Sequence, residues 1–411
     1  MNASTYVPSA YTTRTQNTRK NEPAFYENAA GERVLGMSFL PSFFITVQLC
    51  CHIYLFWNLQ RGFELRSWRF VVAGVLLAGF LMVAFRPKLV EFLDNPLLGK
   101  AIFLWAGFLL IVTILTGGRD LMHFAAWGID RFGGTALSAR IPLAASIRLA
   151  LAAGVLAFGY SLYEASAVRI RHLAIATERL SPEAGQVRIA ALSDLHLFRD
   201  TSAAWVERIV RQTNAQNPDI VVLLGDIVDD RLDRRPDLLT AVRGLTARHG
   251  KFAILGNHEQ YRGLEASTAF LEQAGFAVLR GEVRVVAGVA LAGVDDPVIR
   301  GRRSIGETLA DAPGDHFVVL LAHRPETPAE ARGRFDLQLS GHTHGGQIWP
   351  LALFTRLQCG YWSGVTRLAG GERDGGRPGL LYISRGVGHK NPPVRFLAPP
   401  EITVVDVTSV K

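Results

Sequence analysis

Side chains that bind metal ions recur at the ends of five short apolar runs in the second half of this 411-residue chain. Each run is rich in Val, Ile and Leu and stops at a polar group. The polar groups are Asp194 and His196, then Asp226, Asp229 and Asp230, then Asn257, His258 and Glu259, then His323, and then His342 and His344. A single Asp after a strand usually caps a helix or forms a turn. Five consecutive strand ends that each carry a ligand type predict a shared metal site.

These residue types suit a pair of metal ions. Oxygen and imidazole ligands fit Mn, Fe and Zn, and one shared carboxylate can hold two cations roughly 3.5–4 Å apart. Such a pair binds water as hydroxide near neutral pH and neutralises charge that develops on a phosphoryl group. An Asp-x-His pair on a loop after a strand can direct both side chains at one ion, and so can His-x-His. The pattern is therefore typical of chemistry at phosphorus.

The elements that must position these residues form an α/β domain over about 166–411. The buried strands and their loops are predicted at 187–197, 219–230, 251–259, 317–326 and 335–346. Helices are predicted at 202–216, 236–248 and 264–274, an antiparallel hairpin at 276–294, and later strands at 289–294, 380–384 and 402–407. Ligands of such domains collect at the carboxyl ends of the strands, which is where the polar groups lie.

The first 165 residues have a different character. Apolar stretches at about 34–57, 70–85, 101–117 and 141–163 predict four transmembrane helices, because roughly 20 apolar residues span a bilayer. The second and third stretches are short, and each alone is also consistent with a packed soluble helix. Arg148 lies inside the fourth stretch and is expected to reach toward the membrane interface. Residues 1–33 are polar and are predicted to form a flexible tail.

The side of the membrane follows from the number of spans and from the flanking charges. An even number of spans places the tail and the α/β domain in the same compartment. Basic residues near the helix ends are almost equally divided between the two sides, so the positive-inside rule gives no decision. We expect the cytoplasmic side, because no export signal precedes the first span.

Composition argues against two other classes of function. The formal net charge of +8 is not concentrated in a basic run or an aromatic-basic stripe, so nucleic-acid binding is not indicated. The three cysteines provide neither a disulfide framework nor a CxxC metal site.

The motifs together resemble one protein family. "SDLHL", "GDIVD", "GNHE", "AH" at Ala322-His323 and "GHTHGGQ" occur in the order and spacing of the calcineurin-like metallophosphoesterase superfamily and cover 187–347. The later "ISRGVG" and "PVRFLAPPEI" are similar to the tail of its membrane-associated bacterial branch. The resemblance implies two mixed β-sheets in a sandwich flanked by helices, here behind an all-α transmembrane segment.

The resemblance also implies roles for individual residues. One metal ion would be held by Asp194, His196, Asp226 and His344, and the second by Asp226, Asn257, His323 and His342. In the family, a hydroxide that bridges the two ions attacks phosphorus in line. His258 would then lie beside the leaving group as a general acid or a stabiliser of the transition state, unless it only orients Asn257. Asp229 would orient a ligand or a loop.

Several other residues are less certain. Arg199 and Arg324 follow metal-bearing loops and either meet the substrate phosphate or remain solvated. Gly341, Gly345 and Gly346 are expected to keep the last loop compact, where side chains would crowd the ions.

We therefore expect a membrane-anchored, two-metal phosphoesterase. Its substrate would be a phosphomonoester, phosphodiester or pyrophosphate, either a small molecule or a lipid-linked compound held near the bilayer. Two alternatives are a catalytically inactive scaffold of the same fold and a regulatory domain of a membrane transporter or sensor. Against the first, none of the seven ligands is missing. Against the second, the apolar stretches contain few polar residues.

Overall fold

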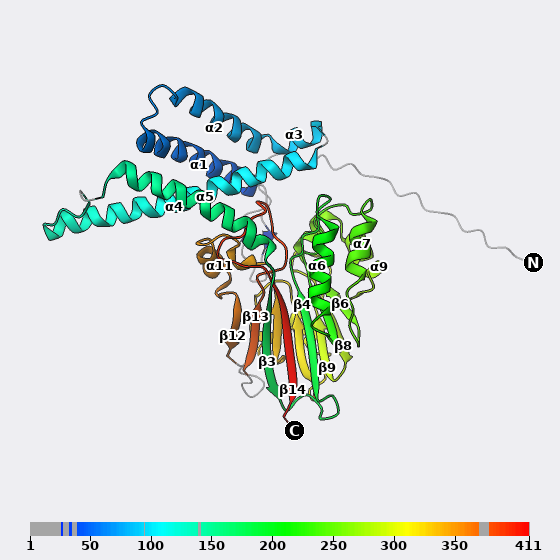
Figure 1. The fold of residues 1–411 in the computed structure, drawn as a ribbon. Helices are drawn as coiled ribbons and strands as arrows, with labels where there is room; N and C mark the ends of the chain where they lie inside the picture. The colour runs from blue at the N-terminus through cyan, green and yellow to red at the C-terminus, as the bar shows by residue number, and fades with distance from the viewer. Residues whose placement is uncertain are drawn as a thin grey trace, which may run out of the picture.

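The computed structural model describes residues 26–27, 33–34, 39–93, 95–138, 141–369 and 378–410. A bundle of helices projects from one end of an α/β domain (Figure 1). The predicted flexible tail, 1–33, lies outside the described residues, except for β1 (Tyr26–Glu27) and the first residue of β2 (Arg33–Val34), which pair antiparallel.

The first sheet of the domain has six strands in the order β3-β14-β4-β5-β6-β7. Their bounds are Arg169–Thr177, Glu401–Ser409, Gln186–Leu192, Ile220–Leu224, Lys251–Ile254 and Ala277–Val278. Strands β4 to β7 are parallel, while β14 is antiparallel to β4 and parallel to β3. The predicted strands of this sheet are therefore present, and β3 is an additional one.

The second sheet also has six strands, in the order β12-β13-β11-β10-β9-β8. Their bounds are Gly364–Leu368, Gly379–Ile383, Leu337–Ser340, Phe317–Leu321, Val289–Gly293 and Glu282–Val286. The four central strands are parallel, and β8 and β12 are antiparallel edges. The hairpin predicted at 276–294 is β8 with β9, so the predicted fold class of two mixed sheets flanked by helices is confirmed.

The core lies in layers on both faces of the first sheet. Alternate residues of a strand point to opposite faces, so Ile189 of β4 packs between the two sheets, while its neighbours Ala190 and Leu192 pack against helices. These helices are α6 (Ala203–Asn214), α7 (Pro236–Arg243) and α9 (Leu264–Gln273). Burial on both faces explains why the strands read as continuous apolar runs.

The strand directions place the ligand-bearing loops at the end of the domain that faces the helices. Strand β3 runs away from the last helix, α5 (Leu143–Ser166), and β14 is parallel to it. Strand β4 is antiparallel to β14, so its carboxyl end returns toward the helices, together with those of β5 and β6 (Figure 1).

The helical segment contains five helices. They are α1 (Phe39–Phe63), α2 (Arg69–Ala84), α3 (Arg86–Leu93), α4 (Pro96–Gly133) and α5. Three stretches of the described residues are long and apolar enough to cross a membrane: Ser42–Phe63, Leu97–Gly133 and Leu143–Ser166.

The prediction of four spans is therefore wrong in its count. Helix α2 has 16 residues and rises about 24 Å, which is less than the roughly 30 Å of a hydrocarbon core. The inference that the tail and the domain share a compartment rested on an even number of spans, and it loses its basis.

Helix α4 continues beyond its apolar stretch, and polar side chains in the continuation contact the neighbouring helices. The stretch predicted at 101–117 belongs to the 38-residue helix α4. Past its apolar part, Arg119 Nε donates to Ser146 Oγ on α5 at 2.9 Å, and Asp120 accepts a hydrogen bond from Tyr54 of α1. Arg148 lies near the start of α5, where its guanidinium sits 5.9 Å from the ring centroid of Phe63.

The helices rest directly on the domain. Ile111 of α4 is buried in one cluster with Ile348 and Val394 of the domain. At the end of α5, Ser161 O accepts a hydrogen bond from Arg395 N at 3.1 Å, and Glu164 Oε2 accepts one from Ala398 N at 3.2 Å. The metal-ligand loops and the apolar helices therefore belong to one packed unit.

We predict that Gly154→Leu destabilises the packing of α5 on α4. A Cβ at Gly154 would lie 2.9 Å from Val112 Cγ2 and 3.1 Å from Val112 Cα, and overpacking of such a contact costs about 1–3 kcal/mol. Thermal unfolding in detergent should therefore begin several degrees lower. Gly159→Leu on the same helix is the control, because no atom lies within 4 Å of its Cβ position. Equal melting temperatures of the two variants would contradict this account of the helix packing.

Candidate metal centre

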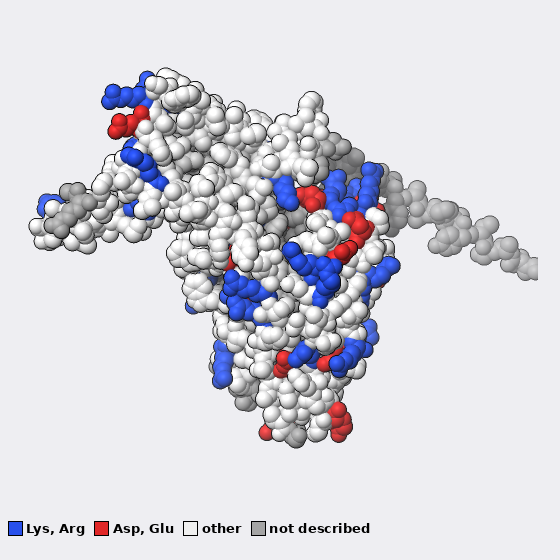
Figure 2. Space-filling view, in the orientation of Figure 1, with Lys and Arg blue, Asp and Glu red and all other residues white. Residues whose placement is uncertain are grey.

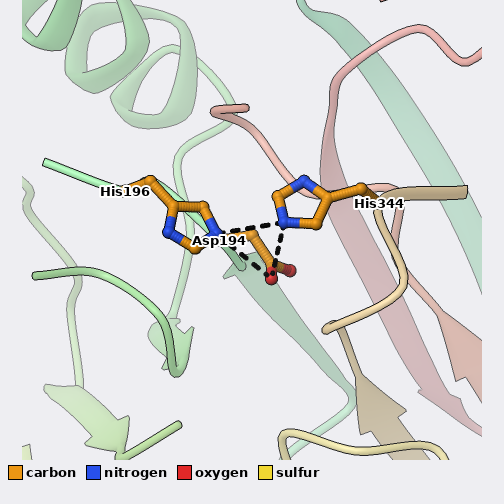
Figure 3. A group of neighbouring side chains, drawn as sticks. All are labelled: Asp194, His196 and His344. Atoms are coloured by element: carbon orange, nitrogen blue, oxygen red, sulfur yellow. Dashed lines mark hydrogen bonds and ion pairs between the residues drawn. The ribbon is translucent and has the colours of Figure 1, made fainter. Parts of the chain in front are cut away.

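The first group of converging ligands comprises Asp194, His196 and His344, whose side chains point toward one another (Figure 3). His344 Nε2 lies 3.4 Å from Asp194 Oδ1 and 3.0 Å from His196 Nε2. All three residues are buried. The loops after β4 and β11, which are far apart in the sequence, therefore supply one set of donor atoms.

The second group comprises Asp226, His323 and His342. Asp226 Oδ2 lies 3.1 Å from His323 Nε2, and His342 Nδ1 lies 3.2 Å from the same nitrogen. Asp226 Oδ2 also lies 3.9 Å from His196 Nε2 of the first group. The Asp226 carboxylate thus stands between the two groups.

The hydrogen bonds on the outer side of the imidazole rings determine which nitrogens face the site. His323 Nδ1 donates to Leu224 O at 2.7 Å, and His196 Nδ1 donates to Asp229 Oδ2 at 3.0 Å. In the neutral rings, each Nε2 is then left with a lone pair that points into the site. His196 and His323 therefore both present Nε2 as a ligand atom.

The buried acceptors fit cations. Asp226 Oδ2 and Asn257 Oδ1 are buried and accept no hydrogen bond from the described residues. Burial lowers the pKa of His323, but the facing Asp226 carboxylate outweighs it and raises that pKa to about 10. Acceptors that face one another in a dry pocket require a proton or a metal ion between them. The donor set of carboxylate, amide and imidazole atoms therefore suits metal binding.

Strained backbone holds these ligands in place. Five of the seven predicted ligands have a positive φ, a region that side chains other than Gly rarely adopt. These are Asp194 (55°), His196 (47°), Asp226 (54°), His342 (69°) and His344 (51°). Such strain is of order 1–3 kcal/mol per residue and clusters at functional sites. The surrounding fold therefore imposes the direction of each ligand.

Glycines let the loops approach closely. A Cβ at Gly341 would overlap Ser193 Oγ and the Asp194 carboxylate, and a Cβ at Gly256 would overlap the Asp226 carboxylate. The space at Gly341 is thus limited by the ligands themselves, whereas the sequence suggested crowding of the ions. At Gly346 a Cβ would overlap the backbone of Ala352.

Asp229 and His258 form the rim of the site. Asp229 accepts hydrogen bonds from both His196 Nδ1 and His258 Nδ1, the latter at 2.8 Å, and also from Arg262 Nε at 2.9 Å. Although burial raises the pKa of Asp229, the hydrogen bonds from His196 and His258 hold it well below its usual range. The His258 side chain is 16% exposed, and its Nε2 lies 3.9 Å from Asp226 Oδ2. His258 therefore faces both the ligands and the entrance.

Glu259 is a structural residue to which sequence reasoning gave no role. Its fully buried carboxylate accepts four backbone hydrogen bonds, from Gly256, Asp226, Ile227 and Val228, at 2.7–3.0 Å. It thereby joins the loop after β5 to the loop after β6. Burial and the Asp226 carboxylate raise the pKa of Glu259. No local sequence pattern predicts this role, because three of the four N–H groups lie about 30 residues before Glu259 in the sequence.

Arg395 is a second residue that sequence reasoning missed. Its fully buried guanidinium donates to the carbonyl oxygens of His344, Ala398 and Gly388, and its Nη2 lies 3.3 Å from His344 Nδ1. Burial lowers its pKa to about 10. Because Arg395 N also bonds to α5, this residue connects the apolar helices with the loop that carries His344.

The arginines considered as phosphate contacts are paired in the structure. Arg199 Nε donates to Asp230 Oδ2 at 3.1 Å in an exposed pair, which also accounts for Asp230. Arg324 Nε donates to the buried Asp296 at 2.8 Å.

Comparison with known proteins agrees with this site and fold. Residues 187–346 match the calcineurin-like phosphoesterase family model. An uncharacterized metallophosphoesterase of Aquifex aeolicus is 37% identical over 264 residues, which cover 62% of this chain and 97% of the relative. One of Helicobacter pylori is 32% identical, with 57% of this chain and 62% of the relative covered. A Bos taurus transmembrane protein with a metallophosphoesterase domain is 26% identical, and the alignment covers 82% of this chain and 79% of the relative.

The chain belongs to the calcineurin-like metallophosphoesterase family, as its motifs predicted. It is therefore a hydrolase of phosphoric esters, and its family uses divalent metal ions. The apolar helices and the similarity to transmembrane relatives indicate association with a membrane.

We predict that Mn²⁺ stabilises the domain through Asp226. A ligand that binds only the folded state, at 100 times its Kd, adds about 2.7 kcal/mol to the free energy of unfolding. Wild type should show a clear rise in melting temperature with Mn²⁺, and Asp226→Asn should lose most of it. Asp230→Asn, on the same loop but in an exposed ion pair, should behave like wild type. An undiminished rise in Asp226→Asn would show that Mn²⁺ binds elsewhere.

Proposed function

We propose that this protein is a membrane-anchored phosphoesterase that uses two metal ions. The observation that carries the proposal is the Asp226 carboxylate between two converging ligand groups. The α/β domain, about 166–411, is the catalytic unit, and the preceding helices hold it at the bilayer.

The ligand sets are those implied by the family motifs. One ion is held by Asp194, His196, Asp226 and His344, and the other by Asp226, Asn257, His323 and His342; both are Mn, Fe or Zn. When bound, two such ions lower the pKa of a shared water and neutralise charge on the phosphoryl group. The positions of six of these ligands in the two converging groups, and the buried Asn257 Oδ1 without a partner, support this assignment.

His258 donates a proton to the leaving oxygen. In this role the ring is protonated on both nitrogens: His258 Nδ1–H donates to the Asp229 carboxylate, which orients the ring, and the proton on Nε2 passes to the leaving oxygen. Because the same carboxylate fixes His196, Asp229 sets the positions of a ligand and of the acid together. His258 is partly exposed and can therefore reach a leaving group, whereas the buried ligands cannot.

The substrate is a phosphomonoester, phosphodiester or pyrophosphate, and we propose one that is linked to a lipid. The carboxyl ends of β4 to β6 face the helices, so the candidate site lies at the end of the domain nearest to the proposed bilayer. The cytoplasmic side for this domain stays a prediction, which reporter fusions after residue 163 will test.

The two alternatives are less well supported. An inactive scaffold has no need of ligand types held in strained backbone around one buried carboxylate. For a transporter, the polar contacts of Arg119 and Asp120 join α4 to α1 and α5 and are accounted for by helix packing.

We predict that His258→Ala lowers kcat by about 10²–10⁴, the usual contribution of a general acid, without loss of bound metal. Full-length protein loaded with Mn²⁺ should be assayed on diester, monoester and pyrophosphate substrates, with metal content measured in parallel. His316→Ala is the control, because His316 lies just before β10, at the opposite end of that strand from His323.

Two outcomes would contradict the proposal. If metal-loaded wild type and His258→Ala were equally inert, the scaffold alternative would hold. If His258→Ala were as active as wild type, His258 would only orient its neighbours.

A further inference from the structure

Exposed apolar side chains gather on one short part of the catalytic domain. Helix α11 (Ala352–Cys359) has no buried residue. It lies within a segment that exposes Trp349 (48%), Leu353 (49%), Phe354 (68%), Leu357 (81%) and Trp362 (51%), here called the α11 surface. Among the described residues from 167 to 410, these are five of the ten exposed large hydrophobic residues. Such a concentration marks an interaction site rather than ordinary surface.

The α11 surface is continuous with the membrane helices. Ile348 and Leu351, on either side of Trp349, pack in one cluster with Ile111 of α4 and Phe158 of α5. In Figure 1, α11 lies at the edge of the domain beneath α4 and α5, on the side toward which these helices project. In Figure 2, the outer edge of this region is white, with basic side chains beside it, and α11 itself carries Arg356. Apolar surface thus runs from the helices onto the domain with basic side chains next to it.

The aromatic residues indicate the depth of this region. Tyr160 and Tyr163 lie in the last turns of α5 and are both exposed. Trp and Tyr are enriched where a protein crosses from the hydrocarbon core to the head groups. Trp349 N donates to Phe396 O at 2.8 Å, and the Phe396 ring lies 6.3 Å from that of Tyr160. Trp349 therefore lies at about the same depth as the end of α5, where Tyr160 and Tyr163 mark the proposed membrane interface.

The α11 surface is also joined to the metal centre. The short helix η3 (His344–Gly346), which begins at a ligand, leads into α11 after five residues, and Gly346 lies directly against the backbone of Ala352. Helix α11 and the predicted ligand His344 are therefore close along the chain and in contact through Gly346. A lipid that remains in the bilayer next to α11 would have its phosphate near the metal ligands.

We propose that the α11 surface inserts into the interfacial layer of the membrane that holds helices α4 and α5. The occupant of this surface is the bilayer itself. The insertion rests on the membrane anchoring in the proposed function, and its consequence for catalysis, access to a phosphorylated lipid without its extraction, rests in addition on the proposed phosphoesterase activity.

The test places an environment-sensitive fluorophore on full-length protein in vesicles of phosphatidylcholine and phosphatidylglycerol. The native residues Cys50, Cys51 and Cys359 are replaced by Ser, and one new cysteine is introduced by Leu357→Cys. Val410→Cys is the matched control, because Val410 is also exposed (57%) and lies near the C-terminus, at the end of the domain away from the helices. The label at 357 should shift to the blue and be quenched by lipids that carry a quencher in the acyl chain, whereas the label at 410 should not.

Two results would overturn the insertion. A label at 357 that is as water-exposed as the label at 410 would show that the surface faces solvent. A shielded label that lipid quenchers do not reach would show that protein, either a second copy or another segment of this chain, covers the surface.

A second measurement tests the consequence for catalysis. Leu357→Glu should lower kcat/KM at least tenfold for phosphatidic acid in vesicles and leave the hydrolysis of soluble p-nitrophenyl phosphate unchanged, because Leu357 contacts no ligand. An equal loss of kcat/KM on both substrates would show that Leu357→Glu damages the site itself. An unchanged kcat/KM on both substrates would show that the insertion does not serve catalysis. If wild type hydrolysed neither substrate, the phosphomonoester form of the proposed function would fail, and the fluorescence result alone would decide the insertion.

Discussion

The structure of the site depends on one buried carboxylate oxygen. Asp226 Oδ2 is buried and lies 3.1 Å from His323 Nε2, with which it forms an ion pair when that ring is protonated. Positive charge is the natural partner for such an oxygen, because an isolated buried carboxylate is far less stable than one in water. Two further features follow from the close approach of acceptor atoms around this oxygen. The backbone of five predicted ligands is left-handed, and glycine occupies positions 256 and 341, where a Cβ would overlap a carboxylate. Glu259 holds the loop that carries Asp226 in place, because its carboxylate accepts four backbone hydrogen bonds.

Parallel strands bring these residues together, and the first sheet also connects the site to the apolar helices. Strands β4, β5 and β6 end together, and strands β10 and β11 of the other sheet bring the remaining histidines to the same place. Helix α5 leads directly into β3, and the antiparallel pairing of β14 with β4 returns the ligand loops toward α5. Arg395 bonds to Ser161 of α5 and to His344, so one buried residue contacts both the apolar helices and the candidate metal site.

The sequence predicted the parts of the structure that local patterns encode. The buried runs around Ile189 and Val222 have the length and composition of parallel strands, and the polar groups after them include the side chains that the structure brings together in groups able to hold a metal ion. The roles of Glu259 and Arg395 depend on backbone groups that are distant in the sequence, so no local pattern reveals them. The number of spans was wrong because apolar composition does not measure helix length: α2 stops after 16 residues, and α4 continues past Arg119 where polar partners are available. Helix α11 was missed because its apolar residues face outward and follow no core periodicity.

The most direct test of the central claim, that two metal ions share Asp226, is electron paramagnetic resonance of the full-length protein with Mn²⁺. Two ions that share a carboxylate lie roughly 3.5–4 Å apart, which is close enough for their spins to couple. At two equivalents of Mn²⁺ per chain, the account predicts the signal of a coupled pair, and its replacement by that of isolated ions in Asp226→Asn. A spectrum of isolated ions from the wild-type protein at full loading would contradict it.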